Sequence, residues 1–371
     1  MTTTLRVVLD QLVAPTDPDL RTASRELAQA LVQTAPRGCV VEAVVPSASE
    51  ATDVGDLVAG LADVRKTALA RRELAAAVQL GAPTGIGGGM IHSPSLFAPL
   101  VRHDRVHDND QTVVTLWDLR PWEAPDELPR ATAMWHRAML KRAVKYADAV
   151  VVPTHAVASR LAELAPKLGD RVRVIAGAAP AGFSVPRDDV GRRRALGLPE
   201  GFILLSGGMA PSDGLERGFA AIAASGLDVP VVVIDAAEGE EPAIAELASA
   251  SGIPETHVHV RCALDTADRA AVFGAAVVFG APSRRTAFPW RVVEALALGV
   301  PVVAADSAVH VEVIVDGGIL VEDRDAAAAA LVSALGSTSA AERLAVLASD
   351  RGRAFSWREA ATRVWELHAE L

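Results

Sequence analysis

Short runs of β-branched residues alternate with longer segments rich in Ala, Leu, Arg and Glu along almost the whole chain. This alternation constrains the fold most, because it predicts βαβ units and parallel sheets. Residues 229–234 form a continuous apolar run, which suits a strand covered on both faces. We expect strands at residues 5–13, 39–45, 113–116, 149–152, 172–175, 202–205, 229–234, 258–260, 276–278 and 300–304. We expect helices at residues 20–34, 130–146, 156–164, 214–224, 240–250, 266–273, 292–297, 325–335 and 357–371.

The alternation stops once, at residues 176–187, which are rich in Gly and Pro and lack periodicity. This stretch is the best candidate for a linker. It divides the 371 residues into two parts, each long enough for one Rossmann-like domain. We therefore predict an α/β protein with domains at residues 1–177 and 178–354 and a final helix at 355–371. Open α/β sheets bind ligands beyond the carboxyl ends of their strands, so the predicted site is an interdomain cleft.

Charge and composition exclude several classes of partner. The net charge is −10 and aromatic residues make up 4% of the chain, so we expect neither nucleic acid nor an anionic membrane surface as partner. Cys39 and Cys262 are too far apart in sequence for a metal knuckle, and their scarcity fits a reducing cytoplasm. Residues 1–12 carry Arg6 and Asp10 within their apolar run, so no signal peptide is expected, and no run is long enough for a transmembrane helix.

Several motifs, in order along nearly the whole chain, resemble those of the family-4 retaining glycosyltransferases of the GT-B fold. Residues 141–160 resemble that family's strand and helix with the pattern ADxVxxxS, and residues 292–303 resemble its signature helix and strand. The other matching stretches are residues 91–100, 113–121, 197–207 and 355–357. Each motif is weak alone, but their order and spacing together indicate the fold.

The resemblance implies transfer of a hexose from a nucleotide diphosphate sugar to a hydroxyl acceptor, with retention of anomeric configuration. It implies that the donor binds mainly to the C-terminal domain and that the last helix crosses back to the N-terminal domain. It implies no metal and no other cofactor, because protein cations and helix N-termini neutralise the donor diphosphate. The donor half has no evident Asp-x-Asp motif, which agrees with this expectation.

The donor site departs from the family pattern at several positions. Gly208 stands where the family has a phosphate-binding Arg, and Asp213 stands where it has a Lys. Thr286 replaces the first of two Glu residues eight apart, and Pro289 replaces a Gly whose N–H could donate. Glu294 matches the second Glu, which in the family binds the nucleotide ribose; the alternative is a simple partner of a helix dipole.

Loss of both cations would cost roughly 3–6 kcal/mol of donor binding, or about two to four decades of affinity. Arg284, Arg285 and Arg291 lie on the same loop and could compensate, but the sequence does not say whether they reach the site. The predicted donor-binding residues are Gly207, Gly208, Asp213, Arg285, Thr286, Arg291 and Glu294.

The acceptor half also departs from the pattern. Trp117 and Asp118 stand where the family often has His-Asp, and residues 15–19 replace its glycine-rich first loop. We predict His92 and Asp118 as catalytic residues on the acceptor side; the alternative for His92 is a loop histidine bonded to backbone. Trp117 and Trp290 could line a sugar-sized pocket or serve packing.

Three functions follow from these observations. The leading hypothesis is a cytoplasmic glycosyltransferase with an atypical donor site, which takes a nucleotide diphosphate sugar and a hydroxyl acceptor that the sequence does not identify. The main alternative is an inactive member that binds and stabilises an active glycosyltransferase partner. The third is a sugar or nucleotide sensor that closes on its ligand without turnover. Affinity for the donor separates the first two, and nucleotide binding without consumption of sugar indicates the third.

Overall fold

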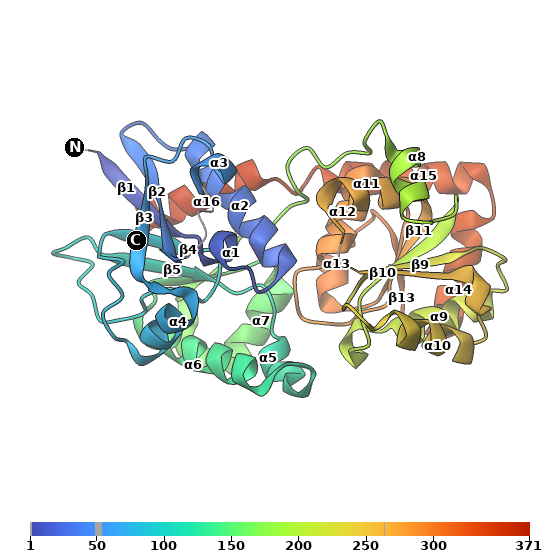
Figure 1. Ribbon diagram of the computed structural model, residues 1–371, viewed down its shortest axis with the longest axis horizontal. Coiled ribbons are helices and arrows are strands. Elements are labelled where there is room, and N and C mark those ends of the chain that lie inside the picture. The colour runs from blue at the N-terminus through green and yellow to red at the C-terminus, as the bar shows by residue number, and fades with distance from the viewer. Residues whose placement is uncertain (1, 49–53, 263) are drawn as a thin grey trace. The chain divides into compact units, whose positions relative to one another are not determined.

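A computed structural model describes residues 2–48, 54–262 and 264–371. The chain divides into two compact units (Figure 1). Unit 1 comprises Met1–Gly177 and Ser356–Leu371, and unit 2 comprises Ala178–Phe355. Among the helices of the described residues, none is both long enough and apolar enough to span a membrane.

Unit 1 is built on a parallel sheet of seven strands within the described residues, in the order β3-β2-β1-β4-β5-β6-β7. Its strands are β1 (Thr3–Val8), β2 (Cys39–Ser47), β3 (Asp63–Ala70), β4 (Met90–Ser93), β5 (Gln111–Thr115), β6 (Ala149–Val152) and β7 (Val172–Val174). Its helices are α1 (Asp10–Val13), α2 (Pro18–Gln33), α3 (Val54–Leu57), α4 (Arg71–Leu80), α5 (Arg120–Glu123), α6 (Arg130–Tyr146), α7 (His155–Leu164) and α16 (Trp357–Glu370), with 3₁₀ turns at Pro125–Glu127 and Pro166–Arg171. All strand pairs are parallel, as the βαβ alternation predicts.

Unit 2 is built on a parallel sheet of six described strands, in the order β10-β9-β8-β11-β12-β13. Its strands are β8 (Phe202–Ser206), β9 (Val231–Ala236), β10 (Val258–Cys262), β11 (Ala276–Ala281), β12 (Val302–Ala305) and β13 (Ile319–Val321). Its helices are α8 (Asp189–Ala195), α9 (Leu215–Ser225), α10 (Glu241–Ala250), α11 (Thr266–Ala275), α12 (Trp290–Leu298), α13 (Ala308–Ile314), α14 (Arg324–Leu335) and α15 (Thr338–Gly352), with 3₁₀ turns at Pro211–Asp213 and Glu255–His257. The predicted class, two Rossmann-like α/β domains, is confirmed.

The core of unit 2 explains why its strands lack polar alternation. Val231 and Val233 on β9 are fully buried and pack with Phe219 of α9 and Leu331 of α14. Because helices cover both faces of the sheet, every residue of such a strand meets apolar neighbours.

Some elements differ from the sequence prediction. The first strand ends at Val8, and Asp10–Val13 form a short helix instead of continuing the strand. Asp10 there is buried and forms an ion pair with Arg71 (2.9 Å), so a charged side chain interrupts the apolar run of the expected strand. Strands β3, β4 and β13 and helices α4, α8, α13 and α15 were not expected. β3 lies at the edge of its sheet, is largely exposed and includes charged residues, and therefore lacks the apolar run that marks the other strands.

The last helix, α16, packs against α2 of unit 1 (Figure 1). Ser356 caps its N-terminus by accepting a hydrogen bond from the backbone N–H of Glu359. Trp365 is buried, and its indole N–H donates to the carbonyl of Leu31 at the C-terminal part of α2 (3.2 Å). The first and last segments of unit 1 are thus joined by a helix pair.

Candidate functional site

The sheet of unit 2 has one point where the strand order reverses. β8 leads through α9 to β9 on one side, while β11 lies on its other side. Ligands of open parallel sheets bind at such a switch point, beyond the carboxyl ends of the strands. Three loops leave the sheet there: β8–α9 (residues 207–214), β9–α10 (residues 237–240) and β11–α12 (residues 282–289). All seven residues predicted to bind the donor lie on the first and third loops or on α12.

The β8–α9 loop carries Gly207, Gly208 and Asp213. Gly207 has a φ of +132°, a conformation that favours glycine. The backbone N–H of Gly208 donates to Oδ2 of Asp213 (2.9 Å), and the N–H of Met209 donates to Oε2 of Glu240 (3.2 Å). The loop thus directs consecutive N–H groups toward carboxylates of the same chain.

The β11–α12 loop contributes one cation directly to this arrangement. Nη1 of Arg285 lies 3.0 Å from Oδ1 of Asp213 and forms an ion pair with it. Arg284 is exposed and donates to the backbone carbonyl of Glu322, away from Asp213. Thr286 lies half-buried on the same loop, and Pro289 directly precedes α12. The negative charge of Asp213 is therefore offset by Arg285.

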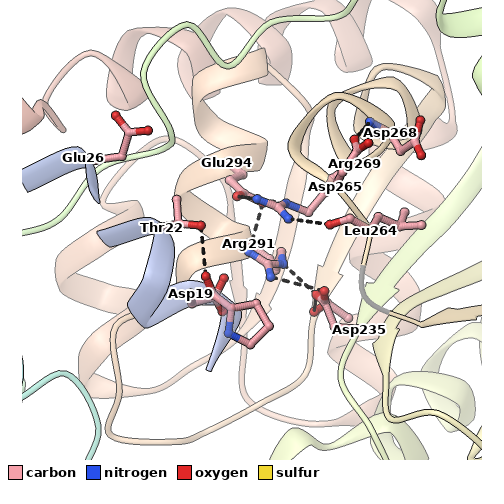
Figure 2. A network of polar contacts seen from close by, with 12 residues as sticks. Asp19, Thr22, Glu26, Asp235, Leu264, Asp265, Asp268, Arg269, Arg291 and Glu294 are labelled. Carbon is pink, nitrogen blue, oxygen red and sulfur yellow. Dashed lines mark hydrogen bonds and ion pairs between the residues drawn. The ribbon is translucent and has the colours of Figure 1, made fainter. Parts of the chain in front are cut away.

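A second group of charges lies at the start of α12 (Figure 2). Arg291 bridges two carboxylates: its Nε donates to Asp235 (2.6 Å) and its Nη1 donates to Glu294 (3.2 Å). Arg269 of α11 binds both oxygens of Glu294, at 2.9–3.1 Å. Glu294 and Arg269 are almost completely buried. Arg291 does reach the edge of the sheet, but two carboxylates of the same unit already hold it.

Glu294 is held by two arginines of its own unit. It lies in the second turn of α12, which has no acidic residue in its first turn, so it is not a partner of the helix N-terminus. Both of its oxygens accept hydrogen bonds from guanidinium groups. Its observed role is to hold Arg269 and Arg291 in place, and a contact with a ribose remains a prediction.

Asp235 is the strained residue of this group. It lies near the end of β9 and has a φ of +65°, which is uncommon for a residue other than glycine. Its carboxylate also accepts from the hydroxyl of Ser206 (2.7 Å). Burial by itself raises the pKa of Asp235, but the Arg291 guanidinium and the hydrogen bonds from Arg291 and Ser206 hold that pKa below its usual range. Asp235 is therefore an anion at neutral pH, and backbone strain at such a position is typical of a functional site.

The two predicted acceptor-side residues lie in different environments in unit 1. His92 lies on β4, has no exposed surface, and its ring stands edge to face with that of His368 at 5.6 Å between centroids. Asp118 is half-buried and accepts the N–H of Arg120 (2.7 Å). Trp117 is buried, donates to the carbonyl of Pro94 (2.8 Å) and packs near Trp357, so packing accounts for it. Asp118 is partly exposed and lies 3.5 Å from Nε of Arg120, whereas the ring of His92 is enclosed.

Sequence reasoning missed Asp235, Glu240 and Arg269. Asp235 had a usable signal, because it directly follows four buried apolar residues of β9 and so lies at the carboxyl edge of the sheet. Glu240 lies on the β9–α10 loop, which follows that strand. Arg269 had no such signal, since its partner Glu294 lies 25 residues away on another helix.

Part of unit 2 is similar to a known protein family. Residues 202–337, which include β8, β9, β11 and α12, match the family model described as glycosyl transferases group 1. The chain is 31% identical over 250 residues to a D-inositol 3-phosphate glycosyltransferase of Nocardioides sp., with 62% of this chain and 55% of that protein covered. It is 32% identical over 263 residues to the enzyme of the same name from Jonesia denitrificans, with 66% and 60% covered. The chain thus spans between a half and two thirds of these relatives' length.

Solved structures show the fold of the whole chain. Sucrose-phosphate synthase from Thermosynechococcus elongatus superposes with a TM-score of 0.70 at 18% identity, covering 99% of this chain and 98% of that chain. Anabaena HepE in complex with UDP and glucose superposes with a TM-score of 0.72 at 17% identity, covering 100% of both chains. The predicted GT-B fold is confirmed.

Proposed function

We propose that this chain is a retaining glycosyltransferase of family-4 type that takes a nucleotide diphosphate sugar and transfers its hexosyl group to a hydroxyl acceptor. Unit 2 is the donor side, and unit 1, with Asp118, is the acceptor side. The observation that carries the proposal is the position of Arg285 and Arg291 at the switch point of the unit 2 sheet, where Arg285 pairs with the same Asp213 carboxylate that accepts the N–H of Gly208. These arginines take the place of the two family cations that Gly208 and Asp213 replace.

The chemistry of a diphosphate explains this assignment. Its negative charge needs cations and N–H donors, and an arginine offers several donors in one plane. The family model that matches residues 202–337 and the structural relatives support the reaction class. HepE was solved with UDP and with UDP-glucose, and two curated relatives carry the name D-inositol 3-phosphate glycosyltransferase. We therefore take a nucleoside diphosphate hexose as the donor class and a cyclic polyol phosphate as the first acceptor to test.

Release of nucleoside diphosphate from UDP-, GDP- and ADP-glucose, with D-inositol 3-phosphate as acceptor, tests the proposal. We expect acceptor-dependent release with one of the three donors, an α-linked product from an α-donor, and no loss of rate in a chelator. We expect Arg291→Met to reduce the rate at least tenfold, while Arg324→Met, a change of an exposed arginine of unit 2, leaves it unchanged. Release that requires Mg²⁺ or Mn²⁺ would contradict the metal-free site.

One observation favours the second candidate, an inactive partner of an active glycosyltransferase. Arg285 and Arg291 both already form ion pairs with carboxylates of unit 2, which lowers the positive charge available to a diphosphate. This alternative predicts no release with any donor. It also predicts that the purified chain increases the stability or the rate of a glycosyltransferase with which it copurifies.

A further inference from the structure

The β8–α9 loop already holds two negatively charged groups. The N–H of Gly208 donates to Asp213 at 2.9 Å, and the N–H of the next residue, Met209, donates to Glu240 at 3.2 Å. Asp213 comes from the end of the same loop, and Glu240 comes from the β9–α10 loop. Each carboxylate uses one oxygen to accept from a backbone amide at the carboxyl edge of the sheet.

These amides are the kind of donor that an anionic ligand uses. Consecutive backbone N–H groups at a strand-to-helix turn bind phosphate and carboxylate oxygens by the same hydrogen bond. Arg285 adds a positive charge on the far side of Asp213 (3.0 Å). The loop therefore has the chemistry of an anion site, and its anions are side chains of the chain itself.

The glycines of this loop fit the two carboxylates closely. A Cβ atom on Gly208 would lie 2.6 Å from Oε2 of Glu240, and one on Gly207 would lie 2.9 Å from Cβ of Asp213. Any larger residue at position 208 would displace the Glu240 carboxylate. Gly208 thus leaves the space that the carboxylate of Glu240 occupies, close to that of Asp213.

We propose that Asp213 and Glu240 are internal competitors of the donor diphosphate and determine the affinity of this site. A phosphate that approaches Gly208 or Met209 must displace a carboxylate or lie beside it, and like charges at short range repel. A ligand without phosphates meets no such competition. The inference rests on the proposed function for the identity of the displaced group, and it makes Asp213 and Glu240 specificity-determining residues.

Calorimetric titration of the full chain and its variants tests the competition. The probes are inorganic pyrophosphate, the three diphosphates UDP, GDP and ADP, and the three corresponding nucleosides. Asp213→Ala, Glu240→Ala and the double variant remove the carboxylates, and Asp213→Asn and Glu240→Gln keep an acceptor oxygen but remove the charge. Glu238→Gln is the matched control, because it removes one charge from an exposed glutamate on the same β9–α10 loop.

We expect the double variant to bind pyrophosphate and one nucleoside diphosphate at least tenfold more tightly than the native chain. Each single variant should give part of that gain, and the affinity for nucleosides and the effect of Glu238→Gln should stay within twofold. The gain should shrink as salt is added, because it is electrostatic. A purely structural role would change nucleoside and diphosphate binding alike.

Two results would overturn the proposal. One is pyrophosphate and diphosphate affinity within twofold of the native value in every variant, whether native binding is strong or absent. The other is an equal gain for nucleosides. Failure of the proposed function looks different, because tighter pyrophosphate binding in the variants, without recognition of any nucleoside or consumption of any sugar, would support the competition while contradicting the transferase assignment.

Discussion

At the scale of single residues, unit 2 pairs its buried charges instead of leaving them for a ligand. Glu294 is 3% exposed, and Arg269, which binds both of its oxygens, is 5% exposed. Removal of one partner of a buried pair leaves an uncompensated charge, which costs far more than the pair itself contributes. The pair therefore fixes the start of α12, and with it the position of Arg291.

We expect Arg269→Met to lower the free energy of unfolding of unit 2 by about 3 kcal/mol, because the buried Glu294 carboxylate then loses the guanidinium that binds both of its oxygens. The double change Arg269→Met with Glu294→Met should recover most of this loss. Urea titration measures the free energy of unfolding of both variants. As a control, Arg324→Met, which breaks an exposed ion pair, should change this free energy by less than about 0.5 kcal/mol. A double variant less stable than Arg269→Met would show that α12 needs the charges themselves.

At the scale of elements, the sequence predicted the strands rich in apolar residues, including the edge strands β7 and β10, and missed the short strand β4 inside its sheet and the edge strands β3 and β13. β6 and α6 have the predicted bounds, because a fully buried strand and a long amphipathic helix leave strong periodic signals. β3 and β13 lie at sheet edges and are short or polar, so their pairing decides their structure.

The contacts of the site could not be predicted from the sequence either. Asp213 and Arg285 are 72 residues apart, and only the parallel order of β8 and β11 brings their loops together.

Helix α16 carries a buried histidine whose charged form is disfavoured by burial. His368 is 2% exposed, and its Nδ1 lies 2.9 Å from Oε1 of Gln111. Burial lowers the pKa of His368 to about 4, although the nearby Asp148 carboxylate opposes this change. Burial, and secondly the neighbouring ring of His368, also hold the pKa of His92 well below its usual value. Both histidines are therefore neutral in the folded chain at neutral pH.

Acidification should loosen α16 from the sheet of unit 1, because the ring of His368 lies against Gln111 of β5 and His92 of β4. The unfolded histidine binds a proton below pH 6.5 and the folded one does so only near pH 4, so stability is lost as the pH falls between these values. His368 alone accounts for about 3 kcal/mol of this loss. Hydrogen exchange of α16 at pH 7 and pH 5 measures the first part of this loss, about 2 kcal/mol, and His368→Gln should weaken the pH dependence. His107→Gln, a change of an exposed histidine of unit 1, should leave it intact. Equal protection of α16 at both pH values would contradict this account.

At the scale of the whole molecule, unit 1 is assembled from the two ends of the chain. Residues 1–177 and 356–371 belong to it, while unit 2 is one continuous segment. Unit 1 thus lacks helix α16 until residues 356–371 have been synthesised. The buried face of α16 is apolar and includes two large side chains, because Trp357, Val364 and Trp365 are all at most 6% exposed. Because residues 178–355 are synthesised before residues 356–371, unit 2 can fold before unit 1 is complete.

Truncation after Phe355 should destabilise unit 1 selectively. It removes the buried face of α16 and the bond from Trp365 to the carbonyl of Leu31, and the loss of one buried Trp costs about 3–5 kcal/mol. Hydrogen exchange should show lower protection in α2, while β8 and β9 of unit 2 serve as the internal reference. Trp365→Ala in the full chain tests the same contact where the truncated chain aggregates, and Trp290→Ala in unit 2 is the control. Native protection of α2 in both the truncated chain and Trp365→Ala would mean that α16 covers unit 1 without stabilising it.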